Sequence, residues 1–265
     1  MFIYTDPDGA PEHTDGTGFL MAISTPSNPE RKWIYLITAK HVLYRNGDDS
    51  KNTKRKGLYA RINLKSGGAE MMPLPLRSSG LGQTVFVDPD PAVDIAVIGL
   101  HVDDGSRFDV LVMDEDRLVT QEDLKKYDIG VGTEIFFTGM FVPFQGQQSN
   151  NPIVRFGKLA MLPGEKIGVG QGSFDAYLVE TFAFGGNSGS PVFFYSSGDD
   201  VPVKLAGVMK GFFVDFEPVL SFGTTAHTKS VSVSQSNSGI AIVVPAEHIR
   251  QILHSEAIEI GRAHV

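Results

Sequence analysis

The chain has 265 residues, of which 42% are hydrophobic and 20% charged, and its formal net charge is −8. This length allows one large domain or two small ones, and the acidic charge argues against a general nucleic-acid-binding protein. Cysteine is absent, which excludes disulfides, thiolate zinc sites and a cysteine nucleophile. The stretch Met1–Gly16 lacks the basic and apolar regions of a secretory signal, and no apolar run could span a bilayer. We therefore expect a soluble, cytoplasmic protein with no membrane partner.

Short segments rich in β-branched and aromatic residues dominate the chain, and clusters of Gly, Pro, Asn and Asp separate them. This pattern is typical of an all-β barrel or sandwich. The predicted strands are Phe19–Ser24, Trp33–Thr38, Leu58–Leu64, Ala92–Leu100, Glu134–Gly139, Tyr177–Phe182, Val192–Tyr195, Lys204–Met209 and Gly239–Val244. Helical patterns occur only at Asp116–Tyr127 and at Ala246–Leu253, which follows a proline.

The polar segment Asp114–Gly132 is the best candidate for a boundary, because about half of the predicted strands lie on each side of it. We expect an N-terminal β-barrel over residues 1–118. Residues 119–265 would hold the linker, a C-terminal β-barrel and a closing helix. Together the two parts would form one functional unit.

Several loops interrupt the strands. The basic end of Arg45–Gly57 would either steer an acidic partner or form a solvated loop, and Gln145–Asn151 is expected to be mobile. The glycine-rich stretch Gly164–Ser173 has no helix after it, so a phosphate-binding loop is excluded and a flexible loop near the functional site is expected. Ala226–Ser238 is interpreted as a surface excursion. The acidic pairs lack the spacing of calcium ligands, so neither a metal nor another cofactor is expected.

The segment from Phe184 to Val192 reads FGGNSGSPV and presents a serine between glycines. Glycine permits a sharp turn with positive φ, and consecutive N–H groups in such a turn can hold an anion. A serine beside converging amides suits acyl transfer, which needs a nucleophile and a place for the developing oxyanion. By itself the segment could also be a glycine-rich hairpin loop.

Two upstream residues could complete such a site. His41 follows the apolar strand Trp33–Thr38, at the end of a rigid element where a general base would lie. Asp94 lies within the apolar run Ala92–Leu100, where a carboxylate is costly to bury without a partner such as a histidine N–H. Taken singly, His41 could be a structural histidine and Asp94 a solvent-facing edge residue. Asp88 and Asp90, which flank prolines, are interpreted as turn residues.

Three motifs in order, Thr38-Ala39-Lys40-His41, Asp94-Ile95-Ala96 and Gly186-Asn187-Ser188-Gly189-Ser190-Pro191, resemble the chymotrypsin-like (trypsin-fold) serine proteases, closest to the bacterial Deg/HtrA-type branch. Supporting matches at the opening strand, the start of the second barrel and the end of the chain extend the resemblance over almost the whole sequence. It implies two six-stranded antiparallel β-barrels with a C-terminal helix. The chain ends soon after that helix, so no PDZ domain is expected.

The resemblance also implies roles for individual residues. Ser188 would be the nucleophile of a serine endopeptidase, His41 the general base and Asp94 the residue that orients the imidazole, while the N–H groups of Gly186 and Ser188 would form the oxyanion hole. The substrate would be a polypeptide. Asn187 replaces the aspartate that in digestive members pairs with a newly cut N-terminus. Activation by loop ordering or by a protein partner is therefore expected instead.

Specificity is predicted from the same resemblance. Phe182 would lie near the base of the S1 pocket, with walls that include Lys210 and Ala241. An aromatic base without charge predicts small or medium apolar P1 residues. The alternative to an endopeptidase is a catalytically quiet module that uses the same fold for binding.

Overall fold

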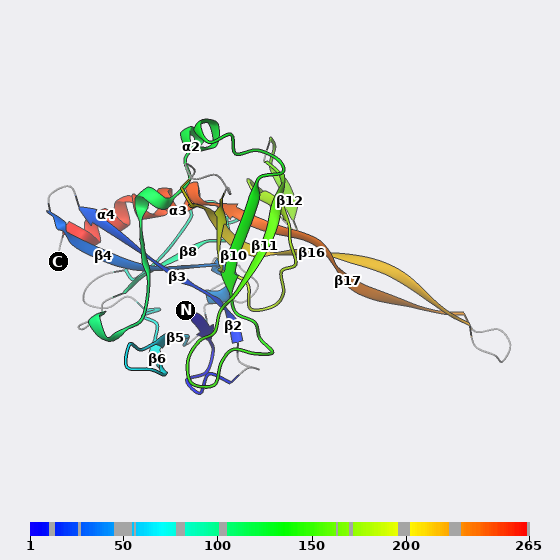
Figure 1. The fold of residues 1–265 in the computed structure, drawn as a ribbon, viewed down its shortest axis with the longest axis horizontal. Helices are drawn as coiled ribbons and strands as arrows, with labels where there is room; N and C mark the ends of the chain where they lie inside the picture. The colour runs from blue at the N-terminus through cyan, green and yellow to red at the C-terminus, as the bar shows by residue number, and fades with distance from the viewer. Residues whose placement is uncertain are drawn as a thin grey trace.

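The computed structural model describes residues 1–10, 14–25, 28–44, 55, 57–77, 83–100, 105–162, 164–169, 172–195, 202–222 and 229–263. Strands dominate these residues, as the composition predicts (Figure 1). None of the helices in the described ranges has the length and apolarity needed to cross a bilayer. The chain is thus an all-β protein with a few short helices.

The second half of the chain forms a closed antiparallel barrel, as predicted. Its strands place one face in a core. In strand β10, for example, buried residues alternate with less buried ones. In pairing order the barrel strands are β10 (Glu134–Gly139), β11 (Ile153–Met161), β14 (Tyr177–Glu180), β17 (Lys229–Pro245), β16 (Lys204–Phe222) and β15 (Pro191–Phe194). A separate hairpin of β12 (Ile167–Val169) and β13 (Gly172–Phe174) occupies part of the glycine-rich stretch that was expected to be a loop.

The first half is built mostly of antiparallel strands, as predicted, but its closure into a six-stranded barrel is not explicit in the described residues. Its described strands form two sheets, and one pair, β3 with β9, is parallel. The larger sheet has the order β7 (Val85–Val87), β8 (Ala96–Leu100), β4 (Asn28–Thr38), β3 (Phe19–Thr25) and β9 (Val112–Asp114). The smaller sheet has the order β2 (Thr14–Thr17), β1 (Phe2–Tyr4), β5 (Tyr59–Asn63) and β6 (Ala69–Pro73). Strands of three residues carry too little alternation to be recognised in a sequence.

Helices are few and short. The closing helix α3 spans Ala246–Leu253, as predicted, and buries its apolar side against the barrel. The mid-chain helix α2 is shorter than predicted, Gln121–Lys126, and begins at a capping box between Thr120 and Asp123. Two further helices, α1 (Lys40–Leu43) and α4 (Glu256–Ala263), were not predicted.

One apolar core joins the two halves. Residues of the larger first sheet, such as Ile37 and Val97, belong to the same buried cluster as barrel residues such as Ile135 and Val208. Helix α3 packs into this cluster through Ile249. Burial of this kind is the main favourable term in folding, so the halves are held together by packing rather than by the linker alone.

The barrel strands β16 and β17 continue far beyond the barrel as a two-stranded ribbon, which we call the arm (Figure 1). The arm comprises Val214–Phe222 and Lys229–Asn237, paired in antiparallel register. The surface excursion predicted at Ala226–Ser238 therefore lies largely within the arm's second strand. The tip, residues 223–228, lies outside the described residues.

The polar loop Gln145–Asn151, expected to be mobile, is instead packed between the halves. Gln145 is buried, and its side chain accepts a hydrogen bond from the Tyr4 hydroxyl at 2.6 Å. The Arg61 guanidinium donates to two carbonyls of the loop at 2.8 Å each. Because its polar groups find partners in the smaller sheet, the loop forms part of the contact between the halves.

Candidate active site

Ser188, His41 and Asp94 meet between the two halves. The Oγ atom of Ser188 lies 2.8 Å from Nε2 of His41, and Nδ1 of His41 lies 2.7 Å from Oδ2 of Asp94. The second carboxylate oxygen of Asp94 accepts the backbone N–H of His41 at 2.9 Å. The imidazole is thereby held in one orientation, with a carboxylate on one side and a hydroxyl on the other. This arrangement can transfer a proton from the serine to the histidine.

The segment that carries Asp94 is fixed before it reaches the site. The side chain of Asp88 accepts the N–H of Asp90 at 2.8 Å, and the side chain of Asp90 accepts the N–H of Ala92 at 2.9 Å, so both aspartates are turn residues as predicted. Lys40, which is buried, donates to the Pro91 carbonyl at 2.8 Å. Asp94 itself precedes strand β8 rather than lying within a strand, which corrects its predicted setting.

Asp94 is ionised at neutral pH. Its burial opposes ionisation, but the charge of His41 and the hydrogen bonds from that residue outweigh the burial, with a further contribution from the charge of Lys210. The pKa of Asp94 therefore lies below its ordinary value. An ionised carboxylate at this position can hold the Nδ1–H tautomer and stabilise the imidazolium that forms when His41 accepts a proton.

The turn that presents Ser188 depends on its glycines. Gly186 and Gly189 have φ values of 88° and 85°, in the left-handed region that other residues rarely adopt. Between them Asn187 is buried, accepts the Phe184 N–H at 2.8 Å and donates to the Met140 carbonyl at 2.7 Å. Both ends of the amide are thus satisfied by backbone groups, one within the turn and one at Met140, and the turn requires no ion pair at this residue.

The N–H groups of Gly186 and Ser188 have no acceptor within the described part of the chain. Neighbouring N–H groups in the same turn are occupied, since Asn187 donates to Phe184 and Ser190 donates to Asn187. Two unused donors beside the serine can stabilise a negative oxygen that develops on an attacked carbonyl.

Solved structures with a similar fold are proteases or protease paralogues. The MamO protease domain from Magnetospirillum magneticum is 15% identical, with a TM-score of 0.48, and the match covers 90% of this chain and 95% of that chain. The active form of the Rv3671c protease from M. tuberculosis is 13% identical, with a TM-score of 0.43 and coverage of 90% and 80%. The scabies mite inactivated protease paralogue S-D1 is 10% identical, with a TM-score of 0.45 and coverage of 84% of each chain.

No protein-family model matches the sequence, and no curated protein matches it. The three neighbours are a protease domain, a protease and an inactivated protease paralogue, and a likeness of this degree carries no argument about chemistry. A fold can carry many functions. The chemistry of this chain therefore depends on its own residues.

Thr17, which the sequence did not single out, lies directly behind the nucleophile turn. Its backbone N–H donates to the Ser188 carbonyl at 2.7 Å, and its hydroxyl donates to the Gly186 carbonyl at 2.8 Å. The same hydroxyl accepts the Met140 N–H at 3.2 Å, and Thr38 donates to the Thr17 carbonyl at 2.7 Å. Thr17 is 3% exposed, so a strand of the first half fixes two carbonyls of the turn in the second half.

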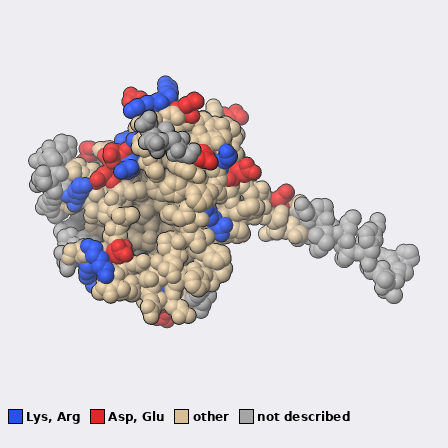
Figure 2. All heavy atoms as spheres, in the orientation of Figure 1, with Lys and Arg blue, Asp and Glu red and all other residues tan. Residues whose placement is uncertain are grey.

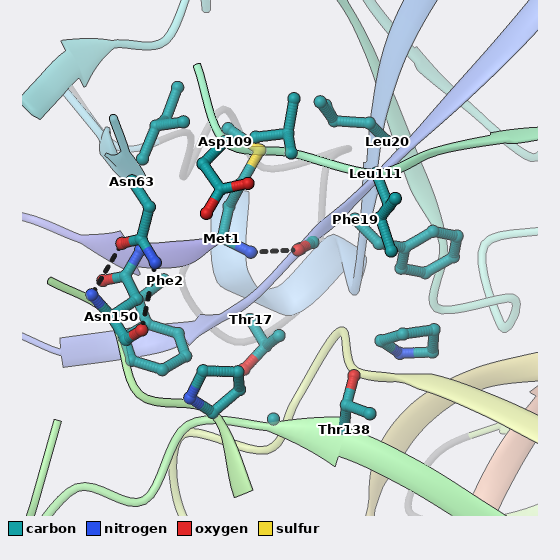
Figure 3. A pocket seen from close by; sticks show the side chains of 16 residues that line it. Met1, Phe2, Thr17, Phe19, Leu20, Asn63, Asp109, Leu111, Thr138 and Asn150 are labelled. Atoms are coloured by element: carbon teal, nitrogen blue, oxygen red, sulfur yellow. Dashed lines mark hydrogen bonds between the residues drawn. The ribbon is translucent and has the colours of Figure 1, made fainter. Parts of the chain in front are cut away.

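A pocket of about 340 Å³ lies beside Thr17, and its lining comes from both halves and includes none of the three triad residues (Figure 3). Its wall includes Phe2, Phe19 and Thr138, and Figure 3 shows Asn63 and Asn150 side by side at one edge. Asn63 donates to the Asn150 carbonyl at 3.1 Å and accepts its N–H at 2.7 Å. These bonds join the smaller sheet to the packed polar loop.

The three residues predicted for the substrate pocket have different settings. Phe182 is 58% exposed and its ring stacks on that of Phe184, with centroids 6.5 Å apart, so it is accessible to a ligand. Lys210 is partly buried and its carbonyl lies 3.3 Å from Ser188 Oγ. Ala241 has no exposed surface and belongs to the barrel core, which corrects its predicted place in a pocket wall. It pairs with Val179 in the barrel, on the buried face of the sheet.

Lys210 has a second contact that the sequence did not reveal. Its ammonium lies 4.1 Å from the ring centroid of Phe174, in the hairpin β12–β13. Burial lowers the pKa of Lys210, while the charge of Asp94 opposes that shift. The glycine-rich segment therefore does lie near the site, through a cation–π contact.

The basic loop Arg45–Gly57 falls largely outside the described residues. Arg55 is described, and its guanidinium forms an ion pair with Asp15. Burial raises the pKa of Asp15, although the charge of Arg55 opposes that shift. Asp15 is close enough for its charge to interact with that of His41. Arg55 is thus occupied by a carboxylate of the chain itself, which does not favour a role in steering an acidic partner.

Proposed function

We propose that the chain is a serine endopeptidase that hydrolyses peptide bonds through an acyl-enzyme intermediate. The observation that carries this proposal is the continuous contact from Ser188 through His41 to the ionised Asp94, at 2.8 Å and 2.7 Å. A binding module would have no need for a nucleophile, a base and an orienting carboxylate in this order. The two unused N–H groups of the turn supply the remaining part that acyl transfer requires.

In the first step Ser188 Oγ attacks the peptide carbonyl while its proton passes to Nε2 of His41. The hydroxyl has a single proton, and His41 at 2.8 Å is a closer acceptor than the Lys210 carbonyl at 3.3 Å. His41 then returns the proton to the leaving amine, which leaves an ester on Ser188. A water molecule, deprotonated by His41, hydrolyses the ester and restores the serine.

The finer assignment follows the sequence resemblance. The Deg/HtrA-type branch and a bacterial and cytoplasmic setting belong to this proposal. Asn187 supports activation without N-terminal cleavage, because its amide is already satisfied by Phe184 and Met140. Ordering of loops, or a protein partner, would then control activity. We propose Gly186 and Ser188 as the oxyanion donors.

The proposed specificity is for apolar residues before the cleaved bond. Phe182 and Phe184 are exposed aromatic residues on the segment that leads into the nucleophile turn. Aromatic surface binds apolar side chains through burial, and it offers no carboxylate for Arg or Lys. A substrate series that differs only at P1 tests this, and cleavage restricted to Arg or Lys would contradict it.

A fluorophosphonate probe tests the chemistry directly, because it forms a covalent bond to an activated serine oxygen with loss of fluoride. We expect one adduct by intact mass on the wild-type chain and none on Ser188→Ala. Ser190→Ala is the matched control, since Ser190 is fully buried two residues away and should not affect labelling. No adduct on any of the three proteins would contradict an enzyme that is active alone, and would leave an enzyme that needs a partner or a catalytically quiet binding module.

A further inference from the structure

A second pocket, of about 380 Å³, has none of the three triad residues in its lining. Its wall combines the linker and the first turns of α2, the chain just before and at the start of β14, and the start of α3. Figure 1 shows the two helices close to one another beside the C-terminal barrel. A pocket of this volume is typical of sites that hold small molecules.

The apolar part of the lining is continuous with the core of the protein. Val119 is 4% exposed and belongs to the main buried cluster, and Leu124 and Leu162 pack against that cluster. These side chains are held by their neighbours and offer a firm hydrocarbon surface. Such a surface binds the apolar part of a ligand by removing it from water.

Tyr177 brings an unused hydroxyl to the pocket. The residue is 5% exposed, and its ring packs on that of Phe194 with centroids 5.6 Å apart. Its hydroxyl makes no hydrogen bond within the described part of the chain. Burial raises the pKa of Tyr177 to about 12, and the charge of Glu247 adds to the shift, so the hydroxyl lies near that carboxylate and stays protonated at neutral pH. A buried hydroxyl without a partner is costly, and a bound ligand would supply the partner.

Apart from a histidine, the charged groups of the described lining are the carboxylates of Asp175 and Glu247, without any Lys or Arg. Charged side chains of both signs lie over α2 and α3 in the view of Figure 2, and pairs such as Arg250 with Glu115, at 3.0 Å, account for some of them. Asp175 has no ion pair among the described residues, and Glu247 lies 3.6 Å from the already paired Arg250. Glu247 also offsets the partial positive charge at the start of α3. The pocket is therefore suited to a cation.

His248 forms a further part of the wall, and its imidazole is held in one orientation. Its Nδ1 lies 2.9 Å from Oδ2 of Asp88, which is 5% exposed and is not among the lining residues. When Nδ1 donates its hydrogen to this carboxylate, Nε2 is left as an acceptor that is available to the pocket. The other oxygen of Asp88 accepts the Asp90 N–H at 2.8 Å, so this wall continues into the segment that carries Asp94.

We propose that this pocket binds a small organic amine, in which a primary ammonium group is attached to an apolar body. The three N–H donors of the ammonium match three kinds of acceptor, namely the two carboxylates, the Tyr177 oxygen and Nε2 of His248. The apolar body lies on Val119 and Leu124, where it displaces water. This binding site is separate from the triad and goes beyond peptide hydrolysis.

Titration calorimetry of the full chain with two matched probes tests the inference. Phenethylamine is positively charged at neutral pH, and 2-phenylethanol has nearly the same shape without a charge. We expect one binding site for phenethylamine, with an affinity about tenfold higher than that of 2-phenylethanol, because only the amine can make charge-assisted hydrogen bonds. Equal affinities would show that only apolar surface is recognised, which overturns the inference.

Single substitutions locate the bound amine. Glu247→Gln removes one charge and Tyr177→Phe removes only the hydroxyl, so each should weaken phenethylamine binding by about threefold to tenfold. The matched control is Glu259→Gln, which makes the same change of charge at an exposed residue of α4 outside the lining and should leave the affinity unchanged. Glu247→Gln should fold normally, since Arg250 keeps its pair with Glu115. An affinity that neither pocket variant changes would place the amine elsewhere and overturn the inference.

A lysine side chain of another protein carries the same ammonium group, so Nα-acetyl-lysine methylamide is titrated in parallel. Weaker binding of this lysine mimic than of phenethylamine supports a small amine as the ligand. Tighter binding of the mimic, reduced by Glu247→Gln, would assign the pocket to a lysine of a partner and overturn the inference. The titrations require no turnover, so their failure leaves the proposed peptidase untouched, and a failure of fluorophosphonate labelling leaves the amine site untouched.

Discussion

The two sides of Ser188 are built differently. Behind it, Thr17, Asn187 and Gly189 are buried and joined by hydrogen bonds that cross from one half of the molecule to the other. In front of it, Phe182, Phe184 and the first arm residues, Val214–Phe216, are exposed, and no strand in the described ranges pairs with the β15 side of strand β16 beyond Met209. The reacting atoms need positions fixed to a fraction of an ångström, whereas a surface that accepts varied polypeptides needs open edges and apolar area. Substitutions behind Ser188 should therefore affect chemistry or folding, and substitutions in front should affect substrate choice.

Among substitutions behind Ser188, the largest loss of kcat is expected from Asp94→Asn. The amide would favour the wrong tautomer of His41 and remove the negative charge beside the imidazolium, so kcat should fall by roughly 10⁴-fold with little change in KM. Steady-state kinetics on one short peptide measures this. A loss below tenfold would show that Asp94 does not orient the base.

The same variant should change the acid stability of the chain. The pKa of Asp94 is lowered in the folded state, so its ionised form stabilises the fold at pH values above the ordinary aspartate pKa. That contribution is lost as pH falls through the lowered folded pKa. Thermal melting between pH 2 and 6 should show a smaller decline at low pH for Asp94→Asn than for the wild type, and parallel curves would contradict this.

The next prediction concerns the stability of the fold and compares alanine substitutions at two glycines of the nucleophile turn, Gly189 and Gly185. A Cβ at Gly189, where φ is 85°, would overlap the Thr17 carbonyl oxygen and the Thr38 hydroxyl. A Cβ at Gly185 would meet nothing within 4 Å, and its φ is not positive. Gly189→Ala should cost about 3 kcal/mol or more and lower Tm by roughly 10 °C, while Gly185→Ala should change stability by less than about 1 kcal/mol.

Differential scanning fluorimetry on the two alanine variants checks this pair. Equal melting temperatures would show that Thr17 and Thr38 can move away from the turn without a loss of stability. In that case the contrast between the two sides of Ser188 would not hold.

A smaller effect, on rate alone, is expected at Thr17. Thr17→Val keeps the shape but removes the hydroxyl that holds the Gly186 carbonyl, so the adjacent oxyanion donor should lose its orientation. We expect kcat to fall on the order of 10- to 100-fold, less than the loss of a donor itself, with KM nearly unchanged. Thr17→Ser retains the hydroxyl and should recover most of the rate. Equal rates for the valine and serine variants would assign Thr17 a packing role only.

The triad could be predicted because each of its residues lies in a short contiguous motif. Ser188, His41 and Asp94 do lie in contact. The barrel could be predicted because strands such as Glu134–Gly139 alternate clearly between buried and less buried residues. Strand β11, Ile153–Met161, was missed because its first six residues alternate only between intermediate and exposed, and Leu159 is its one buried residue. Thr17 belongs to the stretch that resembles the family's opening strand, but its role at the site could not be predicted, because it depends on a strand 169 residues from Gly186 that lies behind the turn.

In the arm, a strand was interpreted as a loop. Its second strand is rich in Ser and Thr, and that composition was interpreted as a surface loop. The alternation of valine and serine through Val231–Ser234 is the pattern of a strand with one apolar face, but the run is short. Its pairing partner was predicted to end at Met209, so no strand was expected opposite it. Pairing with the first strand, not local preference, sets its conformation.

The order of the residues along the chain also determines when activity can begin during synthesis. His41 and Ser188 are 147 residues apart in sequence, and the barrel that holds Ser188 closes through β17, which ends at Pro245. A ribosome-bound chain that has released Ser188 but not this last strand has an open sheet and an unsupported nucleophile. Under the proposed function, folding therefore delays proteolysis until Pro245 has left the ribosome.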